Sequence, residues 1–206
     1  MPKMTEEGLR ARREEIMAAC AKLYEKKSFK DITFRDISAE TTLNRSSLYN
    51  YFQTKEEIFL ALFQREYELW TDDLEAIEKS VAEKSRESFA EAVAKSLEKR
   101  KVLLKLLSMN LYDMEDNSSM QRLTEFKQAY GASIAAMDRC LTSFFPQMDE
   151  SARQEFLYSF FPFMCGIYPY VFVTEKQDEA MRAAGVDLKA DSVEALVRML
   201  VKKMLA

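Results

Sequence analysis

Histidine is absent from this sequence of 206 residues, and its absence excludes several kinds of active site. Histidine is the commonest general base in enzymes and the commonest metal ligand in proteins. Neither a Ser-His-Asp triad nor a Cys-His pair can form without it, and a zinc site is not expected. The composition therefore favours a protein that is not an enzyme and that holds neither a metal ion nor a cofactor.

Glycine and proline are also scarce, at four residues each. Folds made entirely of strands need many tight turns, and tight turns draw on both residue types. Alanine, leucine, glutamate, lysine and methionine are abundant instead, and these residues favour helices. We expect an all-α protein, with a chain long enough for one large domain or for a small domain joined to a larger one.

Long apolar segments are missing as well, since no run approaches the roughly 18 residues that span a bilayer. The chain begins with the charged segment MPKMTEEGLRARREE, which contains no apolar signal sequence. We expect a cytoplasmic protein that does not enter a membrane.

The cysteines Cys20, Cys140 and Cys165 are odd in number and far apart, which indicates reduced thiols in or near the core.

What the sequence does contain is an uneven distribution of charge. Residues 1–55 hold 11 Lys and Arg against 8 Asp and Glu, whereas residues 56–206 hold 19 against 26. The net charge of the whole chain, −4, therefore hides a basic front and an acidic remainder. Such an asymmetry is typical of chains whose two parts bind different partners.

The front of the chain carries the pattern of three helices. Apolar residues at helical spacing predict a first helix over residues 6–27. Thr33 and an aspartate three positions later predict the start of a second helix, which ends near Thr41. Asn44 is a good cap for a third helix over residues 45–52, whose buried stripe is Leu48 and Phe52, four residues apart. Two short helices joined by a tight turn form a helix-turn-helix, which can lay its second helix in the major groove of DNA.

Behind the helix-turn-helix, the sequence predicts a longer helical part. Thr54 and the glutamate three residues later form a capping box for a fourth helix, which runs to about residue 82. No linker rich in glycine or proline separates front from back, and we place the domain boundary between 1–53 and 54–206. The segment 176–190 is predicted to be a surface loop. Further helices are predicted at 86–98, 99–110, 118–145, 149–175 and 191–205.

The third predicted helix exposes side chains that can read bases. Arg45, Ser46 and Ser47 occupy its first turn, the part that reaches base edges in such units. Arginine can form two hydrogen bonds with guanine, and serine can bond to several bases. Asn50 and part of Tyr49 lie on the same exposed side. These residues are the candidates for direct contact with DNA bases.

Four residues are candidates for holding the DNA backbone. Tyr49 and Tyr51 carry hydroxyl groups at the ends of rigid rings, so each can bond a phosphate oxygen while its ring packs on the domain. Lys55 lies in the first turn of the fourth helix, where backbone amides and the helix dipole favour a phosphate. Thr33 has the same opportunity at the start of the second helix. Such contacts position a protein without reading sequence.

Together these residues resemble the DNA-binding motif of the tetracycline-repressor (TetR) family. That motif is roughly T-x-x-x-I-A-x-x-A-G-V-S-x-x-x-L-Y-x-[YH]-F-x-x-K. The resemblance covers about residues 10–65, and a composite pattern at fixed spacing is more specific than a bare helix-turn-helix. The positions that match are Thr33, Ile37, Leu48, Tyr49, Tyr51, Phe52 and Lys55.

The resemblance implies a homodimeric, all-helical regulator of transcription that acts as a repressor. Its small front domain, a three-helix helix-turn-helix domain, would bind double-stranded DNA at a palindromic operator. Its larger domain would form the dimer and bind a small-molecule effector that releases the DNA. By matching position, the phosphate contacts would be Thr33, Tyr49, Tyr51 and Lys55. The residues facing bases would be Arg45, Ser46, Ser47 and Asn50.

The turn before the third helix departs from the family pattern. The family has Ala-Gly-Val-Ser there, whereas this chain has Thr41-Thr42-Leu43-Asn44. Glycine is favoured in such a turn because the backbone often needs a positive φ, which is costly for a β-branched residue. Thr42 therefore predicts either strain or a slightly different turn, and we expect the different turn.

The resemblance also implies that the last two long helices of each subunit form the homodimer interface. The final predicted helix suits this role because one of its faces is apolar, with Val193, Leu196, Val197, Leu200 and Met204. The sequence does not fix the class of effector, although the aromatic composition fits a lipophilic or aromatic molecule. Side chains that could line its pocket, or equally belong to the core, are Trp70, Tyr112, Phe126, Tyr130, Phe163, Met164 and Tyr168.

Other interpretations of the same residues stay open. Tyr49 and Tyr51 also fit exposed amphipathic aromatics, and Ser46 and Ser47 also fit solvated helix positions. The apolar face of the final helix also fits the core of a monomer. Two rival functions are an enzyme with a helical body, supported only by adjacent acidic pairs, and a helical module that binds small molecules or proteins without operator DNA.

Overall fold

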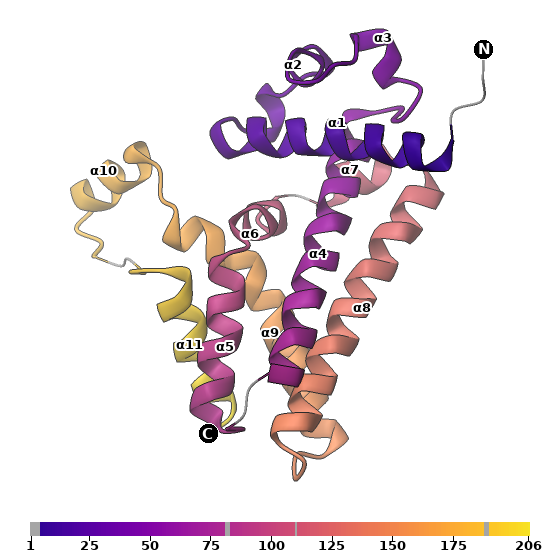
Figure 1. Ribbon diagram of the computed structural model, residues 1–206. Helices are drawn as coiled ribbons and strands as arrows, with labels where there is room; N and C mark the ends of the chain where they lie inside the picture. Colours follow the sequence, from indigo (N-terminus) through magenta and orange to yellow (C-terminus); the bar gives the residue numbers. More distant parts are fainter. Residues whose placement is uncertain (1–4, 81–82, 110, 188–189) are drawn as a thin grey trace. The chain divides into compact units, whose positions relative to one another are not determined.

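The fold is helical throughout the part of the chain that the structure describes. A computed structural model gives residues 5–80, 83–109, 111–187 and 190–206, and within these ranges it contains helices, connecting turns and no strand (Figure 1). This confirms the predicted all-α class.

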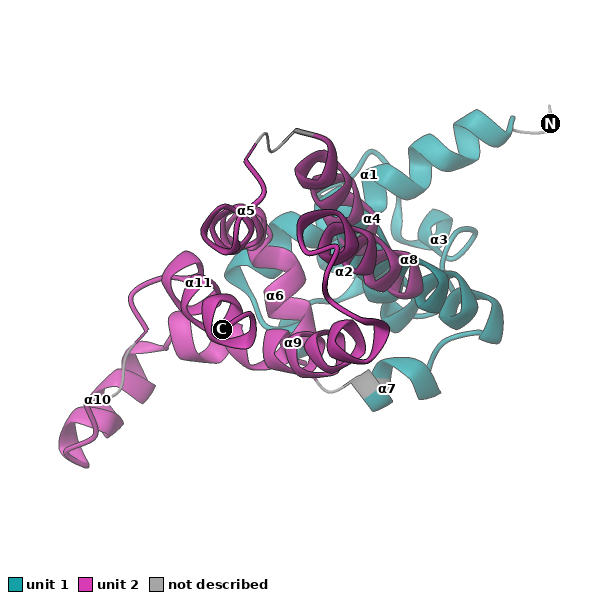
Figure 2. Ribbon diagram, turned by 90° about the horizontal axis from the view of Figure 1, so that it is seen from below, with its two compact units in different colours: residues 1–66, 110–129 teal, residues 67–109, 130–206 magenta. Residues whose placement is uncertain are grey.

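The chain forms two compact units, which Figure 2 colours separately. Unit 1 consists of residues 1–66 and 110–129, and unit 2 consists of residues 67–109 and 130–206. Two long helices each contribute to both units. The boundary between a DNA-binding domain (1–53) and an effector-binding domain (54–206) stays a prediction, because the compact units do not show which residues bind DNA or effector.

Unit 1 contains the helix-turn-helix together with the helices that support it. The side chains of Thr5, Thr33 and Asn44 each accept a hydrogen bond from a backbone amide in the first turn of a helix. These caps confirm the predicted starts of the first three helices. The elements are α1 (Glu6–Lys26), the 3-10 helix η1 (Phe29–Asp31), α2 (Phe34–Ala39), α3 (Arg45–Leu48), the start of α4 (Lys55–Ser80), α7 (Leu111–Asp116) and the start of α8 (Met120–Phe144).

Helix α3 is shorter than the predicted 45–52, because it ends at Leu48. The amides of Asn50 and Tyr51 bond carbonyl oxygens three residues back, at 3.2 and 3.0 Å, so the chain continues in tighter turns. Leu48 and Phe52 are nonetheless buried, as the predicted apolar stripe requires. The error lies in the hydrogen bonding of the last turn and not in which side chains face inward.

Apolar side chains from all the longer elements of unit 1 meet in one core. Three residues of the predicted stripe of α1, Ile16, Cys20 and Tyr24, are buried, whereas Leu23 is half-buried. The rings of Tyr24 and Phe29 both pack edge-on against Phe59 of α4. Phe63 of α4 packs against Phe126 of α8 at 4.9 Å between ring centroids. The buried apolar residues of the unit include Ile16, Cys20, Ile32, Ile37, Leu48, Phe52, Ile58, Leu62 and Met114.

Unit 2 is built from helices of 7 to 22 residues, together with the rest of α4 and α8. Helices α5 and α11 lie side by side, as do α6 and α9, and α11 also contacts α9 (Figure 1). The ring of Phe89 lies within 5.1 to 6.2 Å of the rings of Phe144, Phe145 and Phe156. The elements are the rest of α4 and α8, with α5 (Arg86–Glu98), α6 (Lys101–Leu107), α9 (Glu150–Val171), α10 (Glu175–Ala183) and α11 (Val193–Met204).

Two short helices depart from the sequence prediction. Helix α7 lies in the predicted gap between two helices, and its six residues are too few to show a period. Helix α10 occupies most of the segment predicted to be a loop. None of its side chains is buried, so it carries no apolar stripe, and its ends are set by the cap Thr174 and by Gly185, whose φ is 67°.

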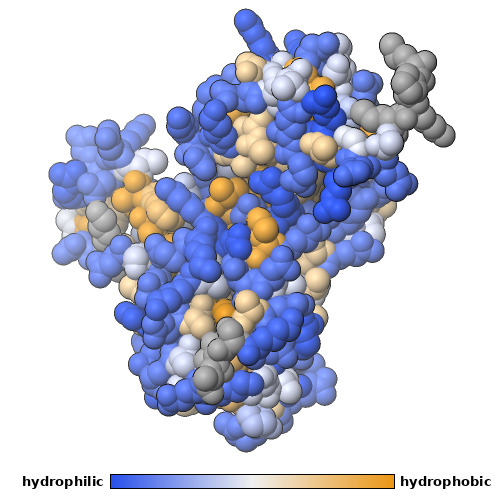
Figure 3. Space-filling model, in the orientation of Figure 1, coloured by the Kyte–Doolittle hydropathy of each residue, from blue (hydrophilic) through white to orange (hydrophobic). Residues whose placement is uncertain are grey.

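The surface is mainly hydrophilic on the face shown in Figure 3, with smaller apolar areas between charged side chains. Within the described residues, no single helix is long and apolar enough to cross a bilayer, and α9 with α10 reaches that limit only as a pair bent by 84°.

Candidate nucleic-acid interface

Helix α1 supports the helix-turn-helix through ion pairs with α2. Lys22 Nζ lies 2.6 Å from Glu40 Oε2, and Lys27 Nζ lies 2.9 Å from Asp36 Oδ1. Figure 1 shows α2 and α3 on one side of α1. Exposed pairs of this kind each contribute little free energy of folding, but they restrict how α2 can turn against α1.

Thr33 begins α2 with the predicted capping box. Its hydroxyl accepts a hydrogen bond from the Asp36 amide at 3.2 Å, and Asp36 Oδ2 accepts one from the Thr33 amide at 2.9 Å. The hydroxyl of Thr33 and the ammonium group of Lys27 also donate to this carboxylate, and together these bonds hold the pKa of Asp36 well below its usual range. Thr33 is exposed at the start of α2, with its hydroxyl already engaged in the cap.

The turn between α2 and α3 is made without left-handed backbone. Among the described residues, glycine is the only type with a positive φ, so Thr42 adopts an ordinary conformation. The turn therefore has no strain from a positive φ at Thr42, as expected. The Thr42 amide donates to Glu15 Oε1 of α1 at 2.6 Å, a contact between residues far apart in the chain that no local pattern predicts.

Asn44 organises the first turn of α3 through one oxygen atom. Its Oδ1 accepts hydrogen bonds from the Ser47 amide at 2.8 Å, from Ser47 Oγ at 2.9 Å and from Ser46 Oγ at 2.7 Å. The two serine hydroxyls therefore have partners within the protein. Each hydroxyl oxygen keeps lone pairs that can accept a further bond.

Two arginines of the helix-turn-helix have free side chains. In the described part of the chain, the guanidinium groups of Arg35 and Arg45 form neither an ion pair nor a hydrogen bond, and both residues are exposed. Arg45 is the first residue of α3 and is one of the residues predicted to face bases. Arg35, near the start of α2, is not among the predicted site residues, although its neighbour Thr33 is. Asn50 is exposed just beyond α3.

The two tyrosines differ in their surroundings. The ring of Tyr49 stacks on the ring of Phe34, with 4.6 Å between centroids and 4° between planes, while 42% of Tyr49 remains exposed. Tyr51 is half-buried. The stacking gives Tyr49 the expected arrangement, a ring packed on the domain with part of its surface accessible.

Lys55 has a structural partner as well as its predicted role. Its Nζ donates to the carbonyl oxygen of Phe29 at 2.8 Å and lies 4.1 Å from the centroid of the Phe29 ring. The start of α4 is also partly occupied, because Thr54 Oγ1 accepts from the Glu57 amide and Glu57 Oε2 accepts from the Gln53 amide. Thr54 caps α4 as predicted, but Glu57 bonds the Gln53 amide and not the Thr54 amide that a capping box requires. The engaged amides of Gln53 and Glu57 leave fewer backbone donors for a phosphate than expected.

The start of α4 is further joined to the junction between α7 and α8. Glu57 Oε1 accepts a hydrogen bond from the Ser119 amide at 3.2 Å, and Thr54 Oγ1 donates to the Asn117 carbonyl at 2.9 Å. Burial of Glu57 raises its pKa, but the bonds from Gln53 and Ser119 outweigh burial and leave it lowered. The partners lie more than sixty residues away in the sequence, so no local pattern indicates them.

Both parts of the chain match the models of known protein families. Residues 16–62 match the family model of bacterial regulatory proteins of the tetR family, and residues 64–205 match that of the tetracyclin repressor-like C-terminal domain. The chain belongs to the TetR family. It is accordingly a DNA-binding regulator of transcription, with a helix-turn-helix in the first matched segment and a helical domain in the second.

Solved structures of other regulators share the fold at low sequence identity. The fatty acid degradation regulator FadR from Bacillus halodurans gives a TM-score of 0.61 at 14% identity, over 95% of each chain. The TetR-family regulator PfmR from Thermus thermophilus gives 0.60 at 16% identity, over 94% of this chain and 95% of that one. No curated protein sequence matches the chain.

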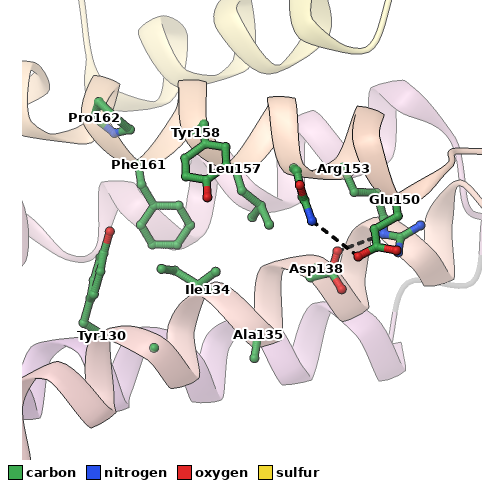
Figure 4. A pocket seen from close by; sticks show the side chains of 12 residues that line it. Tyr130, Ile134, Ala135, Asp138, Glu150, Arg153, Leu157, Tyr158, Phe161 and Pro162 are labelled. Carbon is green, nitrogen blue, oxygen red and sulfur yellow. Dashed lines mark hydrogen bonds and ion pairs between the residues drawn. The ribbon is translucent and has the colours of Figure 1, made fainter.

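The C-terminal domain of this TetR-family chain contains a groove of about 470 Å³ between α8 and α9. Figure 4 shows a polar end, where Arg153 Nε lies 2.8 Å from Asp138 Oδ1, and an apolar end beside Phe161. Burial raises the pKa of Tyr130, which is among the predicted pocket candidates and lines the groove. The other lining residues are Gly131, Ile134, Ala135, Glu150, Gln154, Leu157, Tyr158 and Pro162.

Other candidates for the effector pocket have different positions. Trp70 is fully buried and donates from Nε1 to Ser96 Oγ at 3.1 Å. Tyr112 is 76% exposed, and Phe126 belongs to the core of unit 1. Across the described ranges, no group of three His, Cys, Asp or Glu side chains is placed to hold a metal ion.

Proposed function

We propose that this TetR-family regulator is a repressor, which binds a palindromic operator as a homodimer and is released by a small-molecule effector. The observation that carries the proposal is the first turn of α3, where the Asn44 cap presents Arg45 on an exposed turn with a free guanidinium group. A planar guanidinium group there matches the two acceptors of guanine in the major groove.

Within this proposal, the exposed residues around α3 divide into two roles. Arg45, Ser46, Ser47 and Asn50 contact bases. Thr33, Tyr49, Tyr51 and Lys55 contact phosphates and position the helix. Arg35 joins the second group, since its free guanidinium lies near the start of α2, where phosphates are favoured.

The proposed dimer uses the outer faces of the last two long helices, α9 and α11. Helix α9 exposes the aromatic side chains of Tyr158 at 80% and Tyr170 at 57%, and α11 exposes Met199 at 52%. Val193 and Val197 are buried within their own chain and are not available to a partner, contrary to our grouping of them with the dimer face. A twofold dimer would pair the exposed patch with its own copy.

The proposed effector is lipophilic or aromatic and binds the C-terminal domain. The groove between α8 and α9 supports this class, because Ile134, Leu157 and Phe161 form an apolar wall and Tyr130 adds a hydroxyl group. Sites of this composition favour molecules with an aromatic or aliphatic body and few polar groups.

The proposal is tested by selecting duplexes from a random pool with the full-length chain. The enriched sequence should be an inverted repeat, with half-site centres one helical turn, about 34–36 Å, or a multiple apart. Binding should weaken steeply with salt, as measured by gel shift at several salt concentrations. If no duplex is enriched while the chain still dimerises and binds small molecules, the alternative of a helical binding module without operator DNA is correct.

A further inference from the structure

The turn before α3 is held by a closed network of Arg12, Glu15 and Thr42. Glu15 Oε1 accepts hydrogen bonds from the Thr42 amide at 2.6 Å and from Thr42 Oγ1 at 2.7 Å. Arg12 Nη1 donates to Glu15 Oε2 at 2.8 Å and to Thr42 Oγ1 at 2.7 Å. The Thr42 hydroxyl therefore donates to the carboxylate and accepts from the guanidinium group, so all three side chains are paired with one another.

The bond from the Thr42 amide differs from the other backbone bonds of the turn. The amides of Glu40 and Thr41 donate to carbonyl oxygens three residues earlier, and the Leu43 amide donates to the Thr41 hydroxyl at 3.3 Å. Those bonds determine the shape of the turn but not its position relative to α1. The Thr42 amide bonds a side chain of α1, 27 residues away, and so sets where the turn lies on that helix.

The chemistry of the network makes this attachment strong. Hydrogen bonds from the Thr42 amide and hydroxyl, followed by the bond from Arg12, lower the pKa of Glu15 to about 2. The acceptor is thus an ionised carboxylate, and charge-assisted bonds of this kind are roughly twice as strong as neutral ones. Arg12 balances the negative charge of Glu15, so the network adds no net charge to a region that faces phosphates in the proposed complex.

We propose that Glu15 is a positioning residue for DNA recognition, which sets the place of α3 through the Thr42 amide and thereby determines sequence selectivity. Only Leu43 separates Thr42 from Asn44, the cap of α3, and Arg45 follows directly. A displacement of Thr42 therefore moves the residues that face bases. The inference rests on the proposed function of α3 and adds to it a residue that itself touches no DNA.

The test compares affinity for the selected operator with affinity for a scrambled duplex of equal length, by fluorescence anisotropy at one salt concentration. Glu15→Ala should lower the ratio of the two affinities about tenfold, similar to losing one base contact. Affinity for the scrambled duplex should change less than about twofold, because phosphate contacts remain. Equal loss on both duplexes, or no loss on either, overturns the inference.

Glu25→Ala is the matched control. Glu25 lies on the same helix, is exposed, and forms neither an ion pair nor a hydrogen bond in the described part of the chain. The Glu25→Ala variant loses the same negative charge, and its ratio of operator affinity to scrambled-duplex affinity should equal that of the wild-type protein. If Glu25→Ala lowers the ratio as much as Glu15→Ala does, the effect comes from charge and not from position, and the inference is wrong.

If circular dichroism shows that Glu15→Ala is unfolded, Thr42→Val provides a second test of the inference. This variant retains the amide bond to Glu15 but loses both hydroxyl bonds, and its ratio should fall about threefold. Hydrogen exchange of the Thr42 amide, measured without DNA, should be faster in Glu15→Ala, and unchanged exchange contradicts the attachment itself. A wild-type protein that selects no duplex refutes the proposed function. A selective wild type with an equally selective Glu15→Ala refutes this inference alone.

Discussion

The two units of this protein are stabilised in different ways. Unit 2 has long helices that pack through large rings, such as Phe89 against Phe144 and Phe156. In unit 1, α2 and α3 have only six and four residues, and side-chain hydrogen bonds to backbone amides begin both of them. Isolated helices this short are unstable in water, so α2 and α3 depend on their caps and on α1.

This difference predicts which property a substitution in each unit should change. Burial of apolar area is not directional, so a change in the core of unit 2 should alter mainly the free energy of unfolding. Hydrogen bonds are directional, so a change at the caps and attachments of unit 1 should alter mainly the geometry of α3 and hence DNA binding. Four experiments test this difference.

The largest expected effect is on stability, from Phe89→Ala in unit 2. The ring is fully buried among three other rings, and its removal leaves a cavity, so we expect a loss of about 3–5 kcal/mol in the free energy of unfolding. Urea denaturation followed by circular dichroism measures this loss. The control Glu179→Ala, on the exposed side of α10, should change the midpoint little. A loss below about 1 kcal/mol would show that the ring cluster matters less than its burial indicates.

The next effect is on selectivity, from Arg45→Ala in unit 1. Loss of a bidentate contact should cost about 1–3 kcal/mol of binding and relax preference at one base pair of each half-site. Anisotropy titrations against single-base variants of the selected operator measure both quantities. Arg182→Ala, a change of equal charge on α10, should leave the preference intact. Uniform weakening on every variant would place Arg45 on a phosphate instead.

A pair of matched caps compares the units directly. Asn44→Ala removes the cap of α3, and Asp149→Ala removes the cap of α9, whose Oδ1 accepts from the Ala152 amide at 2.8 Å. Each should cost about 1 kcal/mol of stability, measured by thermal denaturation. DNA affinity should fall for Asn44→Ala and stay unchanged for Asp149→Ala at temperatures where both are folded. Equal DNA affinities would refute the contrast between the units.

The smallest effect is expected for Lys55→Ala. Loss of one phosphate contact should weaken binding to all duplexes alike and lower the slope of log affinity against log salt by about one unit. The contact with Phe29 also disappears, so a small drop in melting temperature should accompany it. Lys55→Arg restores the charge and should restore the slope. An unchanged slope in Lys55→Ala would mean that Lys55 serves only to hold Phe29.

The local parts of this structure could be predicted from the sequence, and the distant contacts could not. The caps Thr33 and Asn44 and the buried stripe of Leu48 and Phe52 depend on residues within a few positions, so local spacing indicates them. The resemblance to the TetR motif rests on the same local spacing. Both domains match that family, and the DNA contacts assigned to single residues remain predictions.

Three physical causes explain why the other helices and contacts could not be predicted from the sequence. Helices α7 and α10 are short or lack a buried face, so they show no hydrophobic period. The partners of Thr42 and Glu57 come from distant helices and become visible only when the fold brings them together. The contact of Lys55 with the carbonyl of Phe29 depends on where η1 begins, which no side-chain pattern indicates.

The hydroxyl bonds to Asn44 have a consequence for the bases that α3 can meet. Ser46 and Ser47 each use their one hydroxyl proton on the same amide oxygen, so both side chains offer lone pairs to an approaching base. As long as these bonds persist on DNA, the complementary groups in the major groove are the exocyclic amines of cytosine and adenine. Asn44 would then determine that Ser46 and Ser47 accept hydrogen bonds from the bases and do not donate them.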